Sequence, residues 1–140
     1  MTNRPMTEIL RRQVPLTLGQ DVSVREASHA MAESGVGAVL VTDPAGRLVG
    51  IFTGRDAIRV LARGLDAAGT TLGVVMTPSP HSLTPECTAI EALRLMRDGG
   101  FRHVPVLRDG VVAGVVSRGD FRGLELDRLD EETGLWERIA

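Results

Sequence analysis

The chain has little of several features that would point to particular classes of protein. A single cysteine, Cys87, stands among its 140 residues. This count excludes an intrachain disulfide framework and fits a reducing compartment. No stretch approaches the roughly 18 apolar residues of a membrane span, and residues 1–12 lack a long apolar core. We therefore expect a cytoplasmic protein that makes no use of a membrane.

An excess of charge of one sign is also missing. Sixteen Lys and Arg residues against eighteen Asp and Glu residues give a formal net charge of −2 at pH 7. This balance leaves no broad basic face, so nucleic acid is not expected as the principal partner. With 140 residues, of which 43% are hydrophobic, the chain can bury one or two compact cores but has no room for a separate catalytic domain.

What the chain does have is an internal repeat. A shift of 65 residues aligns eight identical pairs, and after a one-residue deletion near Asp43 a shift of 64 continues the match. The identical pairs are Pro15 and Pro80, Leu18 and Leu83, Glu26 and Glu91, Ala27 and Ala92, Met31 and Met96, Gly35 and Gly100, Val39 and Val104, and Val41 and Val106. The later pairs are Gly46 and Gly110, Leu48 and Val112, Gly50 and Gly114, Thr53 and Ser117, and Asp56 and Asp120. Two copies of one unit predict a pseudo-two-fold molecule with two related clefts, where small ligands bind.

Each copy predicts the order strand, helix, strand, strand, helix. A hydroxyl residue followed three positions later by glutamate predicts a capping box at two helix starts, Ser23 with Glu26 and Thr88 with Glu91. These helices are expected to end at residues 34 and 98, before glycine. Strands are predicted at 15–18, 38–41 and 48–52, and again at 80–83, 104–107 and 111–116. The closing helices are expected to open at residues 53–56 and 117–120.

The repeat predicts four segments along the chain. They are 1–66, the first repeat with an N-terminal segment; 67–79, a connector; 80–126, the second repeat; and 127–140, a C-terminal extension. The extension contains Leu135, Trp136 and Ile139, which could form one apolar face of a short helix. We favour docking of this face on the module or on a dimer partner over a frayed tail.

The order of these motifs resembles a tandem pair of CBS domains, also called a Bateman module. The resemblance rests on the strand-turn-strand segments, on the hydrophobic-hydrophobic-Ser/Thr-x-x-Asp signatures ending at Asp56 and Asp120, and on the joining segment Val75–Pro78. It covers about residues 8–126. It implies an α/β fold of two βαββα repeats related by a pseudo-two-fold axis, and a disc-shaped homodimer.

The resemblance also implies a ligand and a role. Similar modules bind adenosyl ligands, namely AMP, ADP, ATP or S-adenosylmethionine, and usually regulate another protein. We expect no required cofactor, although magnesium could arrive with a nucleoside triphosphate. The sequence does not name the ligand or the regulated protein.

The Ser/Thr-x-x-Asp element has two interpretations. Thr53 with Asp56, or Ser117 with Asp120, can simply cap a helix N-terminus. However, a glycine in the first turn, as at Gly54, costs roughly 0.5–1 kcal/mol relative to alanine, and close approach of a ligand to the backbone would justify that cost. In this second interpretation the hydroxyl and the helix N-terminus face a phosphate or ribose oxygen. The carboxylate then accepts hydrogen bonds from the ribose hydroxyls. We favour ligand binding.

The resemblance further implies that each site draws on both copies. The residues implied for the first site are Thr53, Arg55, Asp56, His81, Ser82, Phe101, Arg102, His103 and Pro105. Those implied for the second are Leu16, Thr17, Val36, Gly37, Ala38, Ser117, Arg118 and Asp120. The first site has Arg55, Arg102 and, where protonated, His103 for phosphates, while the second has only Arg118, and Leu40 stands where the other copy has Pro105. We therefore expect the first site to be the better one for a phosphorylated adenosine.

Other chemistries are disfavoured. No nucleophile, base and orienting group occur together, so we expect no enzyme. The three histidines are scattered and Cys87 precedes a helix cap, so we expect no metal site. Helix stripes that include Met31, Leu95 and Met96 indicate core or inter-subunit packing, and they are our candidates for the homodimer surface. The alternative to a regulatory module is a structural or interaction module that dimerises with empty clefts.

Overall fold

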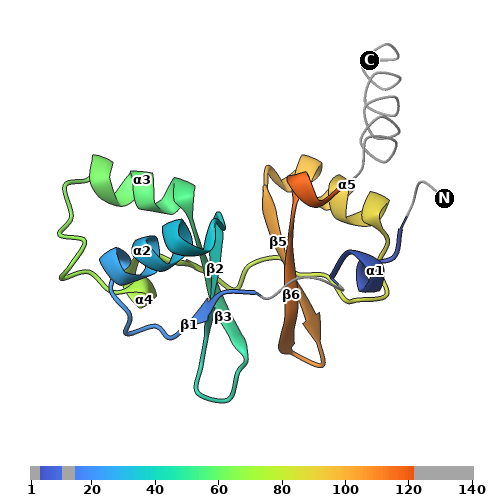
Figure 1. Ribbon diagram of the computed structural model, residues 1–140, viewed down its shortest axis with the longest axis horizontal. Coiled ribbons are helices and arrows are strands. Elements are labelled where there is room, and N and C mark those ends of the chain that lie inside the picture. The colour runs from blue at the N-terminus through green and yellow to red at the C-terminus, as the bar shows by residue number, and fades with distance from the viewer. Residues whose placement is uncertain (1–3, 11–14, 122–140) are drawn as a thin grey trace, which may run out of the picture. The chain divides into compact units, whose positions relative to one another are not determined.

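The computed structural model describes residues 4–10 and 15–121, which form two compact units (Figure 1). We call them the first unit, which holds the first repeat, and the second unit, which holds residues 4–10 and the second repeat apart from residues 109–112, which group with the first unit. Within the described part of the chain, no helix has the length and hydropathy that crossing a bilayer requires.

The first unit is a four-stranded sheet with helices beside it. Its strands are β1 (Thr17–Leu18), β2 (Ala38–Thr42), β3 (Leu48–Thr53) and β4 (Thr77–Pro78), in that spatial order. Strand β1 runs parallel to β2, and the other pairs are antiparallel. Its helices are α2 (Val24–Ser34), α3 (Gly54–Ala62) and α4 (Leu72–Val75). Figure 1 shows α2 and α3 lying together on one side of the sheet.

The ends of α2 follow from local chemistry. Ser23 Oγ accepts a hydrogen bond from the Glu26 N–H at 3.1 Å, which satisfies one free donor of the first turn. Gly35 ends the helix in the left-handed conformation with φ of 66°, which glycine adopts without a steric penalty. The apolar face between these caps packs on the inner face of the sheet. The buried core of the first unit consists of Val24, Ala27, Met31, Val39, Val41, Phe52, Val60 and Leu72.

The second unit repeats the capped helix and the central strand pair of the first, with a two-stranded sheet. Its elements are α1 (Met6–Leu10), α5 (Ala89–Gly99), β5 (His103–Arg108), β6 (Val111–Ser117) and the 3₁₀ turn η1 (Arg118–Asp120). Leu83 pairs in parallel with Val106, which is the register of Leu18 with Val41 moved by 65 residues. Thr88 and Glu91 form a complete capping box at the start of α5. The buried core consists of Met6, Ile9, Ala89, Ile90, Ala92, Leu93, Met96, Val104, Val106, Val116 and Phe121.

The short helices α1 and α4 hold equivalent places in the two units. Leu72 N–H donates to Val22 O and Val24 N–H donates to Thr70 O, both at 2.9 Å. In the second unit Met6 N–H donates to Cys87 O at 2.8 Å and Ala89 N–H donates to Arg4 O at 2.7 Å. The repeat positions correspond, because Val22 and Val24 lie 65 residues before Cys87 and Ala89. Leu72 and Met6 both have no exposed surface. Helix α4 therefore precedes the second repeat in the sequence but packs in the core of the first. Helix α1 precedes the first repeat but packs in the core of the second (Figure 1).

The helices α2, α3 and α5 are present, and the mixed α/β fold with two repeats is confirmed. The strands are present except the one predicted at 80–83, where only Leu83 forms an isolated bridge, with Val106. The expectation that Met31 and Met96 line a homodimer surface is wrong, since they are 7% and 2% exposed in the cores of their own units. The predicted second closing helix begins as η1. Its continuation and the extension with Trp136 lie outside the described residues. The four segment boundaries stay predictions.

Candidate ligand-binding site

The first candidate element is the turn from β3 into α3. Thr53 is the N-cap of α3, and Asp56 N–H donates to Thr53 Oγ1 at 3.3 Å. In return Asp56 Oδ2 accepts from Thr53 N–H at 2.9 Å and from the Thr53 hydroxyl at 3.1 Å. This reciprocal capping box is what the first interpretation of the element, a helix N-cap, predicts. It also fixes the direction of the carboxylate.

The remaining oxygen of Asp56 faces an arginine that the sequence analysis did not assign to the site. Arg59 Nη1 lies 3.2 Å from Asp56 Oδ1, with side chains that are 65% and 8% exposed, respectively. Because Arg59 is mostly in solvent, this ion pair contributes at most about 1 kcal/mol and can be exchanged for another donor. The sequence indicates this pair by the three-residue spacing of Asp56 and Arg59 on one helix. Asp56 thus keeps one oxygen that a ligand hydroxyl could reach when Arg59 moves.

The second candidate element repeats this chemistry at the end of β6. Asp120 Oδ2 accepts from Ser117 N–H at 2.6 Å and from the Ser117 hydroxyl at 3.3 Å. Asp120 is half-buried, whereas Asp56 is buried. The backbone oxygen of Asp120 accepts a hydrogen bond from Arg4 Nη2 at 3.0 Å. Nothing in the sequence pattern points to Arg4, which lies 116 residues away.

Each element is tied to the residues that precede the neighbouring strand of its own unit. Gly54 N–H donates to Gly37 O at 3.1 Å, and Arg118 N–H donates to Arg102 O at 3.3 Å. In the first unit Ala38 also pairs with Thr53 across β2 and β3. The structure therefore brings Gly37 and Ala38 to the Thr53 element, and Arg102 to the Ser117 element. The assignment of these residues to the opposite elements, which the resemblance implies, stays a prediction.

His103 lies next to the second element, and its surroundings disfavour the protonated form of its imidazole. Burial lowers its pKa below the ordinary value of 6.5, Asp120 opposes this shift, and the positive charge of Arg102 adds to it. This shift disfavours the protonated form, and a contact of His103 with phosphate stays a prediction. A neutral imidazole can still donate one hydrogen bond.

The glycines of both elements have room beside them. Among the described residues, a Cβ added to Gly54 would meet no neighbouring atom within 4 Å, and one added to Gly119 would come no closer than 3.8 Å, to Ser117 Oγ. By contrast, a Cβ at Gly99 would collide with the ring of Phe101, so Gly99 is required by packing. Nothing in the described chain requires glycine at Gly54 or Gly119, and the space beside them is what an approaching ligand would need.

The other predicted site residues fall into three groups by burial. The exposed ones are Thr17, Val36, Gly37, Arg55, His81, Ser82, Arg102 and Arg118. Those of intermediate burial are Leu16, Thr53, Phe101, His103, Ser117 and Asp120, and those that are buried are Ala38, Asp56 and Pro105. The Pro105 carbonyl accepts from Leu83 N–H at 2.9 Å, so Pro105 serves to join strand segments. The exposed arginines are the groups best placed to meet a phosphate in solution.

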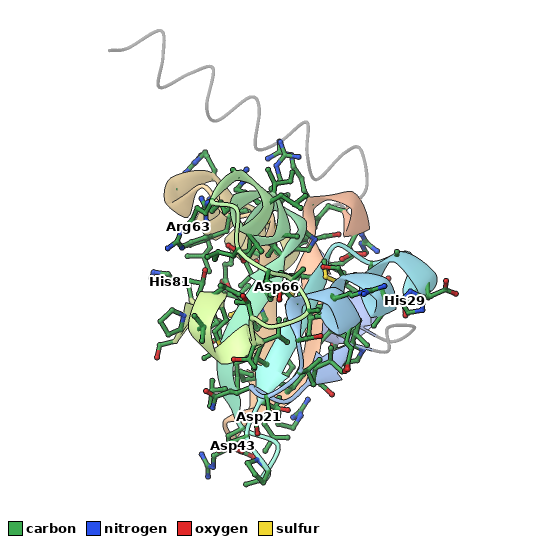
Figure 2. All side chains as sticks on the ribbon, turned by 90° about the vertical axis from the view of Figure 1, so that its left-hand side faces the viewer. Asp21, His29, Asp43, Arg63, Asp66 and His81 are labelled. Atoms are coloured by element: carbon green, nitrogen blue, oxygen red, sulfur yellow. The ribbon has the colours of Figure 1, made fainter. Side chains whose placement is uncertain are left out.

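Metal ligands do not gather in the described chain. In Figure 2 the labelled His29 and His81 lie at opposite sides of the view, with Asp21, Asp43 and Asp66 spread between them. Over residues 4–10 and 15–121, no group of three or more His, Cys, Asp or Glu side chains could hold a metal ion. The expectation that the protein needs no metal stays a prediction.

Comparison with known proteins decides the family. The model of the CBS domain matches residues 6–63 and 72–127, which is most of the chain. The chain belongs to the CBS domain family. It carries a pair of CBS domains, and the resemblance noted from the sequence is confirmed.

One similar curated protein is the CBS domain-containing protein CBSCBSPB2 of Arabidopsis thaliana. It is 42% identical over 108 residues, which cover 76% of this chain but 20% of that protein. The CBS pair described above spans about a fifth of the length of the first curated relatives that it matches. What those longer proteins do as a whole therefore does not carry over directly.

Two solved structures are similar over nearly the whole chain. The CBS domain protein PAE2072 from Pyrobaculum aerophilum, in complex with AMP, has a TM-score of 0.82 and 26% identity, covering 91% of this chain and 98% of that one. The CBS domain pair of protein MJ0100, in complex with 5-methylthioadenosine and S-adenosyl-L-methionine, has a TM-score of 0.77 and 25% identity, covering 89% and 98%. Both ligands of MJ0100 and the ligand of PAE2072 contain adenosine.

Proposed function

We propose that this CBS pair is a regulatory module that binds an adenosine-containing ligand, AMP, ADP, ATP or S-adenosylmethionine, and passes the resulting change to another protein. The observation that carries the proposal is the similarity, over 91% of the chain, to a CBS protein in complex with AMP. The twofold occurrence of a Ser/Thr-x-x-Asp turn with open space beside its glycine supports it. A cytoplasmic location and the lack of catalysis are parts of the same proposal.

The two aspartates are proposed to hold the ribose. A carboxylate accepts hydrogen bonds from two neighbouring hydroxyls, and such charge-assisted bonds are stronger than neutral ones. Oδ2 of each aspartate is already occupied by its Thr53 or Ser117 partner, so Oδ1 is the oxygen left for the ligand. At Asp56 the ligand would replace the exposed guanidinium of Arg59. The capping box then serves to orient the binding carboxylate.

Arg102 is proposed to contact a phosphate of the ligand. It is exposed on the segment just before β5, and its guanidinium can form bidentate bonds to phosphate oxygens. We expect Arg102→Ala to weaken AMP binding by about tenfold or more, since a hydrogen bond to a charged group contributes about 1.5–3 kcal/mol. Adenosine, which lacks the phosphate, should bind almost as before. Calorimetric titration with both ligands measures the difference, and equal losses would contradict a phosphate contact.

The proposal is tested by titrating AMP into two matched variants, Asp56→Asn and Asp120→Asn. Asparagine keeps an oxygen for the capping bond from Thr53 or Ser117 but loses the charge. We expect the Asp56 variant to lose more AMP affinity, as the better site. Combining each change with Arg102→Ala shows which aspartate shares a ligand with the arginine, because coupled changes are not additive. Unchanged affinity in both aspartate variants would contradict the proposed ribose contacts.

The alternative is a structural or interaction module without a ligand. The complete capping box of Thr53 and Asp56 favours it, because the motif is already satisfied within the chain. Thermal unfolding separates the two functions: a ligand that binds only the native state stabilises it by RT ln(1 + [L]/Kd). A thermal midpoint that adenine nucleotides and S-adenosylmethionine all leave unchanged would favour the structural module.

A further inference from the structure

The Asp120 element is held from two directions. Its carboxylate accepts from Ser117 within the turn, while its backbone oxygen accepts from the guanidinium of Arg4 at 3.0 Å. The second contact joins residues 116 positions apart in the sequence but within one compact unit. A long-range contact at the centre of a candidate ligand element can affect the ligand without touching it.

The backbone around Arg4 is anchored independently of its side chain. Arg4 O accepts from Ala89 N–H at 2.7 Å, and Pro5 forms an antiparallel bridge with Thr88. The next residue, Met6, has no exposed surface in the core of the second unit. The backbone of Arg4 is therefore already ordered, so only the freedom of its side chain is lost when the guanidinium meets Asp120.

The first unit offers a natural comparison, because the position that corresponds to Arg4 there is Thr70. The carbonyl of Arg4 accepts from Ala89, the first residue of α5, and that of Thr70 accepts from Val24, the first residue of α2. The side chain of threonine is too short to donate a long-range hydrogen bond like that of Arg4 to Asp120 O. In the first unit Asp56 belongs to a nine-residue helix, whereas Asp120 ends a three-residue 3₁₀ turn.

We propose that Arg4 is a positioning residue for ligand binding at Asp120. By holding the backbone oxygen of Asp120, it fixes the direction in which the carboxylate meets the ribose hydroxyls of an adenosyl ligand. This inference rests on the proposed function of the aspartates. It makes the affinity of the Asp120 site depend on docking of the N-terminal segment 4–10.

The test compares Arg4→Gln with a matched control, Arg25→Gln, whose arginine is exposed on α2 of the first unit. AMP and adenosine are titrated into the full chain and into each variant, alone and combined with Asp120→Asn. We expect Arg4→Gln to weaken both ligands equally, by about threefold to tenfold, which corresponds to one partly lost charge-assisted bond. It should have no further effect when Asp120 is already changed. The control should bind as the unchanged protein does.

Hydrogen exchange adds a readout that needs no ligand. In Arg4→Gln the amides of Arg118 and Phe121 should exchange faster, while those of α3 should not change. Arg4→Lys, which keeps the positive charge, should restore part of the affinity and serves as the second variant if Arg4→Gln does not fold.

Several results would overturn the inference. AMP affinity unchanged in Arg4→Gln but reduced in Asp120→Asn would remove Arg4 and leave the proposed function standing. A larger loss for AMP than for adenosine would mean that Arg4 contacts phosphate directly, not through Asp120. If the unchanged protein binds neither ligand, the proposed function itself fails. Exchange rates at Arg118 and Phe121 that do not respond to Arg4→Gln would show that the contact does not hold the turn.

Discussion

Gly54 is the residue at which the two interpretations of the Thr53 element make opposite demands. It occupies the first position of α3 with open space beside it. Without a ligand, Gly54→Ala should stabilise the fold by about 0.5–1 kcal/mol, because alanine loses less backbone entropy. If a ligand approaches the backbone there, the added methyl group should weaken its binding.

Chemical denaturation and AMP titration of Gly54→Ala measure the two effects separately. Gly119→Ala is the matched variant in the second unit, where the nearest atom that the Cβ would meet among the described residues is Ser117 Oγ at 3.8 Å. A stabilised Gly54→Ala protein that binds AMP unchanged would speak for a capping role alone.

His103 should make the stability of the protein depend on pH. Burial lowers the pKa of its imidazole in the folded state, with Asp120 opposing and Arg102 reinforcing the shift. The unfolded chain, with a pKa near 6.5, then binds a proton before the folded protein does. The free energy of unfolding should therefore fall as the pH decreases from 6.5 through the folded-state pKa, and this residue should add no slope above that window.

The measurement is chemical denaturation at a series of pH values for the unchanged protein and His103→Asn. Asparagine does not titrate, so the variant should lose less stability on acidification. Equal slopes in the two proteins between pH 6.5 and lower values would contradict a lowered pKa of the half-buried His103.

At the scale of elements, α1 and α4 should stabilise the units in which they are buried. Leu72 and Met6 have no exposed surface, and replacing such a side chain by alanine costs about 2–5 kcal/mol. We expect Leu72→Ala to accelerate hydrogen exchange at Val39 and Val41 of the first unit. Met6→Ala should do so at Val104 and Val106 of the second.

The control for this prediction is Val74→Ala, since Val74 lies on α4 with 75% of its surface exposed. It should change neither unit measurably. If Met6→Ala loosened the first unit instead, the placement of α1 in the second core would be contradicted.

The elements that could be predicted from the sequence are those that residues close in the sequence specify. Ser23 and Thr88 mark helix starts, and the apolar runs mark β2, β3, β5 and β6, because caps and burial patterns act within a few residues. The helices α1 and α4 escaped prediction because each is short and is stabilised by a core distant in the sequence. Arg4 escaped for the same reason, whereas Arg59 was within reach of a helical-spacing argument.

At the scale of the whole molecule, we still expect a homodimer, but not through the methionine stripes. Ile58 and Leu61 lie three residues apart on α3 and are 66% and 74% exposed. Two neighbouring apolar side chains this exposed on one helix make α3 our candidate for the dimer contact. We expect Leu61→Asp to shift the protein toward monomer, because it places a charge in the contact.

Sedimentation velocity at micromolar concentration checks this expectation. Val74→Asp, an equally exposed change on α4, is the control and should leave the assembly state unaltered. A monomer in the unchanged protein, with and without AMP, would contradict the homodimer and would leave the binding proposal intact.

The crossed placement of α1 and α4 has a consequence for the ancestry of the fold. If one repeat was duplicated together with its leading segment, the duplicated segment of chain did not coincide with the folded unit, because each leading segment packs in the other repeat. A single ancestral repeat would have had no neighbouring repeat on its own chain to receive a residue such as Met6 or Leu72. Two identical chains could have received each other's leading segments, which is domain swapping. In this view, fusion of two repeats into one chain turned an exchange of leading segments between molecules into the present exchange of α1 and α4 between repeats.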